Sequence, residues 1–551
     1  GAFYGCTSLE EIKLNAPVIS ANLFTGCDNI KTIVLGKDVA VIGENAFANC
    51  DRLTEIKVDA KNPNITSDNG ILYSKDKTEV VLVPRYKATT DLTLPETVTK
   101  IGNGAFSGVK RISKVTAKGV TEIGDYAFYN STVSKAEFGN VSEIGAYAFA
   151  SSNLEAFPVF NVNGGDYALK TIGDYAFAFA SKLQTLDLSV YGDGLVIGDY
   201  AFVQCTNLTS LTIGNDAKIG SHAFACTMSL NTFENVQNTR VFEDTRYYKE
   251  EKVIVKDADG NENVFYYLYY QVENGTNSNL AQVTMGENVE IGDYAFLYNA
   301  NLKEVNLGDG AKIGDYAFST CKNLDKIDLS KVKSIGDYAF SGIRTRVYSK
   351  SESRYGYAYK WEIVNGELVA TDYLYSSLAS GITEANLAEG VQLGMGVFAF
   401  TEKLANVTLP ANFTGKVSET EEGIETFEQN YIPAYTFAYS TKLSAADFTN
   451  VIGIGSYAFA FTSMQTLNLA NTANVGSYAF TRAPLTSVKL ADDSIIGDAA
   501  FANCNKLATV ENLESAVSIG DYAFMRTQIS SLALTNAEKV GDFAFAKTNV
   551  T

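Results

Sequence analysis

Apolar residues recur along this chain in two alternating patterns. The first places them at positions 1, 4 and usually 6 of a short segment, as at Leu183, Leu186 and Leu188. Polar residues fill the gaps, so the last two apolar positions alternate with a polar one, as in a half-buried strand. The pattern therefore predicts many short strands, each with one face in a core and the other in water.

The second pattern is a hexapeptide, Ile-Gly-x-x-Ala-Phe, which returns between the strand segments. Neighbouring copies mostly begin 21 to 25 residues apart. A fixed period of this length predicts a stacked repeat architecture of the leucine-rich-repeat kind. Copies that keep the isoleucine, glycine, alanine and phenylalanine begin at Ile42, Ile101, Ile123, Ile144, Ile172, Ile197, Ile219, Ile291, Ile313, Ile335, Ile454, Ile496 and Ile519.

The hexapeptide predicts a tight turn followed by a short helical turn. Its glycine lets the backbone bend, and its alanine and phenylalanine are expected in the core. The third position usually holds Asp, Asn or Ser, whose short side chains accept hydrogen bonds from the unpaired N–H groups at a helix start. We therefore expect structural caps at Asp125, Asp174, Asp199, Asp293, Asp315, Asp337 and Asp521.

A single repeat buries too little apolar surface to offset the conformational entropy of about 22 ordered residues, so stability must come from stacking. We predict an α/β repeat fold: one continuous right-handed solenoid over residues 1–551, with a parallel β-sheet and short helical turns. The residues resemble the BspA-like leucine-rich-repeat proteins, whose repeat runs LxxLxLxxxVxxIGxxAFxxC. That resemblance implies a secreted or cell-surface protein of a family with several adhesins for host proteins or other cells.

Four segments interrupt the period, at about 58–100, 234–285, 342–392 and 410–429. The first contains two apolar runs around Lys75-Asp76-Lys77, and the second has a turn signal at Asp259-Gly260-Asn261. The third contains Asn365-Gly366 between alternating runs, the strongest short hairpin signal. We expect inserted β-hairpins in these three and a polar loop in the fourth.

Charge and hydropathy exclude several classes of function. The net charge is −19, and no run of Lys and Arg could replace the counterions of nucleic acid, so we expect no nucleic-acid partner. No apolar stretch reaches the 18 residues of a membrane span, so we expect no membrane insertion within this sequence. Because it begins and stops within a motif, we expect a fragment whose targeting or anchoring segment is missing.

No catalytic or cofactor pattern is present. Six of the seven cysteines stand three residues after a motif phenylalanine, a register that indicates reduced thiols packed in a core. There is no CxxC pair for a metal. His222, the only histidine, has no nucleophile partner and is interpreted as a solvent-facing repeat variant. We expect neither an enzyme nor a cofactor.

Tyrosine is the most prominent candidate for recognition. It recurs at the fourth hexapeptide position, where stacked repeats would form an aromatic stripe. Either the rings pack on one another and shield the turn, or the stripe binds a partner, since tyrosine is favoured at interfaces. The second and third insertions are also aromatic. They are expected to fold back on the repeats or on each other as one knob, whose candidate partner-binding residues are Tyr269, Tyr355, Tyr357 and Trp361.

The leading functional interpretation is a non-enzymatic extracellular binding protein that engages a protein or glycan through its solenoid surface and these insertions. The alternative is a structural subunit or stalk of a surface filament or lattice, with self-association as its interaction. A further alternative is that the insertions only cap exposed sheet edges.

Overall fold

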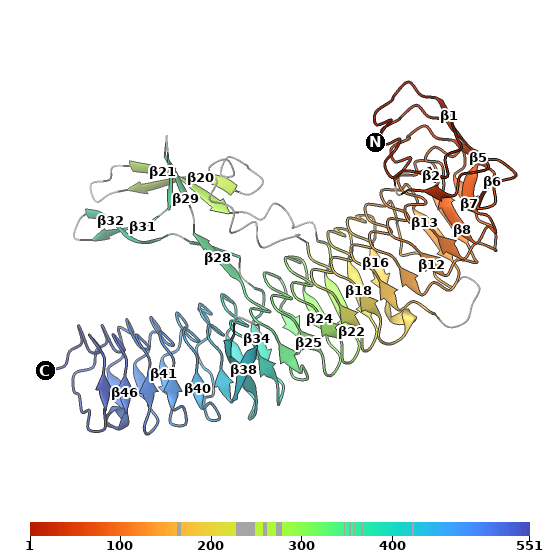
Figure 1. Ribbon diagram of the computed structural model, residues 1–551. Helices are drawn as coiled ribbons and strands as arrows, with labels where there is room; N and C mark the ends of the chain where they lie inside the picture. The colour runs from red at the N-terminus through yellow and green to blue at the C-terminus, as the bar shows by residue number, and fades with distance from the viewer. Residues whose placement is uncertain are drawn as a thin grey trace. The chain divides into compact units, whose positions relative to one another are not determined.

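The computed structural model describes the chain except for residues 44, 162–166, 227–247, 257–259, 261, 271–277, 347, 352–353, 358, 365–366, 374, 379 and 421–423. The chain forms two compact units. Unit 1 comprises Gly1–Cys226 and Ser278–Ala295, and unit 2 comprises Thr227–Asn277 and Phe296–Thr551. Within each unit the repeats form coils that stack through parallel strands (Figure 1).

In unit 1 most coils contribute one strand from each sequence pattern. The leucine pattern forms β1 (Glu11–Leu14), β3 (Thr32–Leu35), β5 (Glu55–Val58), β9 (Asp91–Thr93), β11 (Lys114–Ala117), β13 (Lys135–Phe138), β16 (Thr185–Asp187), β18 (Ser210–Ile213) and β22 (Gln282–Met285). The start of the hexapeptide forms β2 (Val18–Ile19), β4 (Val41–Ile42), β10 (Lys100–Ile101), β12 (Glu122–Ile123), β14 (Glu143–Ile144), β15 (Thr171–Ile172), β17 (Val196–Ile197), β19 (Lys218–Ile219) and β23 (Glu290–Ile291).

Unit 2 repeats this scheme. Its leucine-pattern strands are β24 (Glu304–Asn306), β26 (Lys326–Ile327), β34 (Glu384–Asn386), β36 (Asn406–Thr408), β41 (Thr466–Asn468), β43 (Ser487–Lys489) and β45 (Thr509–Glu511). Its hexapeptide strands are β25 (Lys312–Ile313), β27 (Ser334–Ile335), β35 (Gln392–Leu393), β39 (Tyr431–Ile432), β40 (Gly453–Ile454), β42 (Asn474–Val475), β44 (Ile495–Ile496), β46 (Ser518–Ile519) and β47 (Lys539–Val540). Equivalent residues pair in register, as Ile496 does with Ile519.

The phenylalanines of the hexapeptides form the centre of the core. Their rings stack from coil to coil, with centroids 4.6 to 5.1 Å apart from Phe106 to Phe224 in unit 1. In unit 2 the spacing is 5.1 to 5.7 Å from Phe296 to Phe545. These side chains thus fill the space between successive coils, which is how repeats that cannot fold alone become stable.

The predicted helical turns are not confirmed. Among the described residues there is no α-helix, and 3-10 turns occur only at Ser189–Tyr191 and Leu513–Ser515. In the hexapeptide the N–H groups of Tyr126 and Phe128 donate to the next coil, at Ala146 and Ala148, whereas that of Ala127 donates back to Gly124. Because alternate N–H groups leave the coil, the i→i−4 pattern of a helix cannot form. The right-handed sense of the coil stays a prediction, as does a single continuous solenoid.

The motif glycine is required by the close approach of coils rather than by the bend alone. A Cβ added to Gly145 would lie 2.6 Å from the backbone nitrogen of Asp125, and one on Gly173 would lie 2.8 Å from that of Ala146. Neither glycine has a positive φ. Only a residue without a side chain lets neighbouring backbones come this near.

Two insertions form the predicted hairpins, and a third pairs as expected around its turn. The first consists of β6 (Ile65–Asp68), β7 (Ile71–Ser74) and β8 (Glu79–Leu82), which are antiparallel. The second is the hairpin of β20 (Tyr248–Lys256) and β21 (Glu262–Tyr270). The third contains β28 (Ile343–Arg346), β29 (Tyr348–Ser351), β30 (Arg354–Tyr357), β31 (Tyr359–Val364), β32 (Glu367–Tyr373) and β33 (Tyr375–Leu378). Asn365 and Gly366 lie outside the described residues, but β31 and β32 pair on either side of them.

The prediction of a loop at 410–429 was wrong. This segment forms an antiparallel hairpin of β37 (Thr414–Glu419) and β38 (Glu425–Gln429), and β37 also pairs in parallel with β35. Its polar, acidic sequence lacks the alternation of a half-buried strand. Backbone pairing between the strands and the buried side chain of Lys416 keep the hairpin in place.

Candidate interaction surfaces

The tyrosines of the fourth hexapeptide position form an aromatic ladder. In unit 1, successive centroids from Tyr126 to Tyr294 are 4.6 to 4.8 Å apart. In unit 2, Tyr435, Tyr457 and Tyr478 stack at 5.0 and 4.7 Å. The rings inside each run therefore have both faces covered by their neighbours, which agrees with the packing interpretation of the stripe. Burial raises the pKa of Tyr200 and Tyr457.

These tyrosines have a left-handed backbone, with φ near +55° at Tyr126, Tyr147 and Tyr175. A bulky residue in this region is strained by about 1–2 kcal/mol. The strain is offset because the conformation aims each tyrosine N–H at the next coil and stacks its ring. The sequence shows the recurrence of tyrosine but not this conformation.

The aspartates of the third position form a second ladder, and their role as helix caps must be corrected. The Oδ1 of Asp125 accepts the N–H of Ala146, and that of Asp174 accepts the N–H of Asp199. The N–H donor thus belongs to the third hexapeptide position of the next coil. These aspartates link successive coils and do not cap a helix. Asp199, Asp315, Asp337, Asp498 and Asp521 accept in the same way from Ser221, Asp337, Met395, Asp521 and Asp542. For Asp293 the structure gives a hydrogen bond of the main chain: its backbone carbonyl accepts the N–H of His222.

His222 is not solvent-facing, contrary to the sequence-based interpretation. Its side chain is buried between Tyr200 and Tyr294, with centroids 4.6 and 4.7 Å away. Its Nδ1 lies 2.9 Å from the hydroxyl of Ser221. Burial lowers the pKa of His222, although Asp199 and Asp293 act in the opposite direction. The histidine therefore continues the aromatic ladder.

The cysteines occupy core positions, as expected. All seven are free and all except Cys6 are buried. The thiol of Cys205 donates to the carbonyl of Phe177 and that of Cys504 to the carbonyl of Phe480, one coil before. Burial raises the pKa of both thiols to about 12. Among the described residues no group of His, Cys, Asp and Glu could hold a metal ion.

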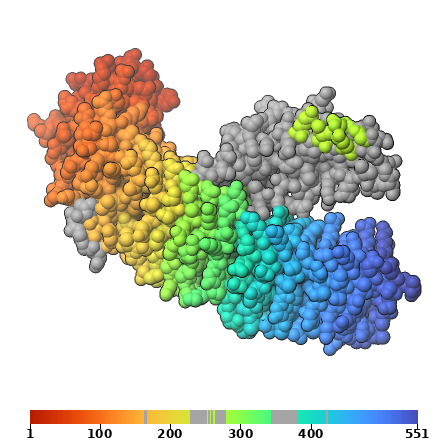
Figure 2. Space-filling model, turned by 180° about the vertical axis from the view of Figure 1, so that it is seen from behind, coloured from red at the N-terminus to blue at the C-terminus, as the bar shows by residue number. Residues whose placement is uncertain are grey.

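The second and third insertions join in one antiparallel sheet of unit 2, in the order β20-β21-β29-β30. The contact between them is β21 with β29, where Tyr266 pairs with Lys350 and Leu268 with Tyr348. On β20, the described side chains of Lys252, Ile254 and Lys256 are exposed (yellow-green in Figure 2). They occupy alternate positions, so they share one face of the sheet.

The strand register places the candidate partner-binding residues on this sheet and beside it. Lys252 pairs with Tyr266, Tyr266 with Lys350, and Lys350 with Tyr355, so Tyr355 and Tyr357 share the face of Lys252. Tyr269 stands three positions after Tyr266 in β21. Because successive strand positions alternate between the two faces, it belongs to the other face. Trp361 lies in β31, at an irregularity of its pairing with β32. The side chains of these four residues lie outside the described part of the structure.

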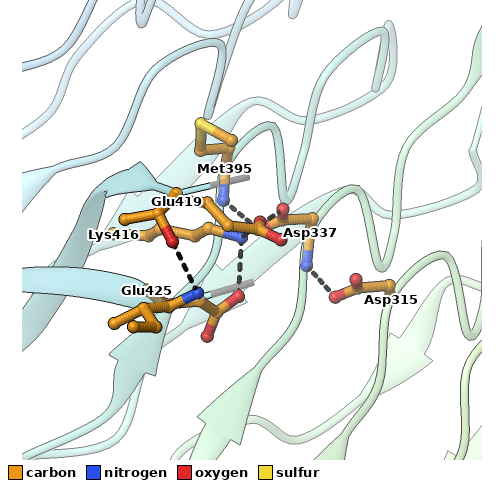
Figure 3. A network of polar contacts seen from close by, with 8 residues as sticks. Asp315, Asp337, Met395, Lys416, Glu419 and Glu425 are labelled. Atoms are coloured by element: carbon orange, nitrogen blue, oxygen red, sulfur yellow. Dashed lines mark hydrogen bonds and ion pairs between the residues drawn. The ribbon is translucent and has the colours of Figure 1, made fainter. Parts of the chain in front are cut away.

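Sequence reasoning missed a buried cation in the fourth insertion, Lys416 on β37. Its side chain is 1% exposed, and its Nζ lies 2.8 Å from Asp337, 2.6 Å from Glu419 and 2.6 Å from Glu425 (Figure 3). Burial by itself would lower the pKa of Lys416, but the hydrogen bonds to the three carboxylates outweigh it and raise the pKa. The only signal in the sequence was a lone lysine before an acidic run.

Comparison with known families identifies the repeat. A family model described as "BspA type Leucine rich repeat region" matches residues 1–76, 85–189, 161–254, 274–349 and 430–551. No curated protein matches the sequence. Within the described residues no helix is long and apolar enough to cross a membrane.

Several solved structures are similar. The pneumococcal vaccine antigen PcpA is 18% identical with a TM-score of 0.32, over 54% of this chain and 63% of that one. A leucine-rich repeat protein from Bacteroides ovatus is 15% identical with a TM-score of 0.31, over 98% and 84%. A leucine rich cell surface protein from Faecalibacterium prausnitzii is 15% identical with a TM-score of 0.28, over 82% and 96%. The chain thus spans less than two thirds of PcpA, and TM-scores this low carry no functional argument.

Proposed function

This chain belongs to the BspA-type leucine-rich-repeat family, and from that premise we propose that it is a non-enzymatic extracellular or cell-surface protein that binds a protein or glycan partner in the manner of an adhesin. A regular scaffold with inserted elements suits this role, because binding residues concentrate on segments held by rigid elements.

The observation that carries the proposal is the pairing of β21 with β29. It joins residues 80 apart in the sequence, such as Leu268 and Tyr348, from two different insertions into one sheet. Lys252 and Ile254 are exposed on one face of that sheet. By strand register, Tyr266, Tyr355 and Tyr357 occupy backbone positions of the same face. Tyrosine offers broad apolar contact together with a hydrogen-bonding hydroxyl, and it is enriched at recognition surfaces.

The test compares the two faces of this sheet. The labelled chain is applied to epithelial cell monolayers, with Tyr355→Ser/Tyr357→Ser as the test variant and Tyr269→Ser as the control on the opposite face. We expect the double variant to lose at least about tenfold in affinity, which is about 1.4 kcal/mol, and the control to bind like the parent chain. Periodate or protease treatment of the cells then distinguishes a glycan partner from a protein.

Equal binding by all three proteins would contradict the proposed site. Absence of binding to cells, together with concentration-dependent association in analytical ultracentrifugation, would favour the alternative role as a subunit of a surface filament or lattice.

A further inference from the structure

A second ladder of unit 2 runs through the eighth position of the repeat, two residues after the motif phenylalanine. Its members all have φ between 58° and 61°. The N–H of Phe461 donates to Thr481 and that of Arg482 to Ala502, so each residue is fixed to the next coil. We call the part of it that contains Phe400, Tyr439, Phe461, Arg482, Asn503 and Arg526 the eighth-position ladder.

Neighbouring side chains of this ladder are in contact from Phe400 to Arg482, and again between Asn503 and Arg526. The ring centroids of Phe400 and Tyr439 are 4.9 Å apart, and those of Tyr439 and Phe461 are 4.2 Å apart. The guanidinium carbon of Arg482 lies 5.3 Å from the Phe461 centroid. In the following coils, Nη1 of Arg526 donates to Oδ1 of Asn503 at 3.3 Å. The result is an ordered row of three rings, a guanidinium, an amide and a second guanidinium.

The charge of this row is opposite to that of the whole protein. The chain has a net charge of −19, yet no member of the ladder is acidic and the two arginines are exposed. The three rings are half-buried and stacked at interplanar angles of 14°, so they present edges. The edge of an aromatic ring is the positive part of its quadrupole. Ring edges, guanidinium groups and an amide all favour an electron-rich ligand.

We propose that the eighth-position ladder binds a linear acidic polysaccharide whose chain runs along the stacking direction. The proposal rests on the binding function above and assigns a second contact region and a ligand class to it. The carboxylates of the sugar chain pair with Arg482 and Arg526, and its ring oxygens and hydroxyls lie over Asn503 and the aromatic edges.

Periodicity favours a polysaccharide over an acidic peptide. Arg482 and Arg526 are two coils apart, which is about 10 Å for stacked strands about 4.8 Å apart. A sugar ring in an extended chain advances by about one such spacing, so in a chain of uronate rings the carboxylates of every second ring keep in register with the arginines. An extended peptide advances about 3.4 Å per residue, with side chains of one face about 7 Å apart, and loses that register.

The test measures binding of the full chain to a fluorescent oligogalacturonate of about ten rings, with dextran as the neutral sugar and poly-L-glutamate as the acidic peptide. We expect the oligogalacturonate to bind most tightly, with an affinity that falls as salt rises. Arg482→Gln/Arg526→Gln should weaken its binding at least about tenfold. Lys489→Gln/Lys539→Gln is the matched control, since it removes the same charge from exposed residues elsewhere in unit 2 and should not change the affinity.

Three results would overturn the proposal: no binding of the oligogalacturonate, equal affinity of the arginine variant and its control, or equally tight binding of poly-L-glutamate. If the double arginine variant loses its folded circular dichroism spectrum, Arg526→Gln alone provides the comparison. The tyrosine variant Tyr355→Ser/Tyr357→Ser should keep its affinity for the oligogalacturonate. A failure of polysaccharide binding by the eighth-position ladder can therefore be distinguished from a failure of partner binding by the β20-β21-β29-β30 sheet.

Discussion

At the scale of single residues, the fold depends on side chains and N–H groups that act between coils. Asp174 accepts the N–H of Asp199, and Tyr175 stacks on Tyr200, both one repeat apart. Ala146 replaces the aspartate in one coil, so the ladder tolerates a missing member. The contribution of one member should therefore be modest and local.

Replacing Asp174 by Ala should remove the acceptor of the Asp199 N–H and destabilise unit 1 by about 1 kcal/mol. The measurement is the urea unfolding midpoint, together with amide exchange at Asp199, which should become faster. Asp193→Ala, at an exposed residue of the same coil, is the control. If both variants exchange at the same rate as the parent chain, the ladder bond does not contribute to stability.

His222 should make stability depend on pH below about 7, where the unfolded chain begins to take up a proton that the folded chain does not. Its folded pKa is lowered by burial, so the unfolded chain takes up the proton first, near pH 6.5. The stabilisation is therefore present above the unfolded pKa and is lost as the pH falls through it toward the folded pKa. His222→Tyr, which restores the usual residue of the repeat, should flatten the urea midpoint over this range. Parallel profiles of the two proteins would contradict the assignment.

At the scale of elements, the hairpin β37–β38 shows how tertiary contacts can form strands without an apolar pattern. Its backbone pairs with β35, and Lys416 joins it to Asp337 of the preceding repeats. Asp337 also accepts the N–H of Met395 with its other oxygen. One buried cation thus connects the hairpin to the aspartate ladder.

Replacing Lys416 by Met should destabilise unit 2 by roughly 3 kcal/mol, because it leaves the carboxylates of Asp337, Glu419 and Glu425 together without a cation. Chemical denaturation at pH 7 measures the effect. Lys489→Met, at an exposed lysine, should change the midpoint little. Adding Glu425→Gln should recover part of the loss, and no difference between the two methionine variants would show that the network is dispensable.

At the scale of the whole molecule, stability is distributed along the stack. Both units contain the same phenylalanine ladder and the same buried thiol register, for example Cys205 in unit 1 and Cys504 in unit 2. The thiols are therefore natural reporters of the opening of each unit.

A thiol-specific disulfide reagent should modify only Cys6 rapidly in the folded protein and all seven cysteines in denaturant. The other six are buried, and burial raises the pKa of Cys205 and Cys504 to about 12, so little reactive thiolate forms at neutral pH. Fewer than seven thiols in denaturant would indicate disulfides. Rapid reaction of several cysteines in the folded state would contradict the packed core.

The sequence by itself determined the repeat, the leucine-pattern strand of each coil, the phenylalanine and cysteine core and the hairpins of the first three insertions, but not the second strand at the start of the hexapeptide. These follow from local periodicity, and a period repeated many times permits only stacking. Tertiary structure alone decided that the turn is not helical, that Asp125 bonds to the next coil and that His222 is buried. It also decided that β21 pairs with β29 and that Lys416 gathers three carboxylates. Each of these depends on a partner at least 21 residues away or on a left-handed backbone, which no local pattern of apolar and polar residues encodes.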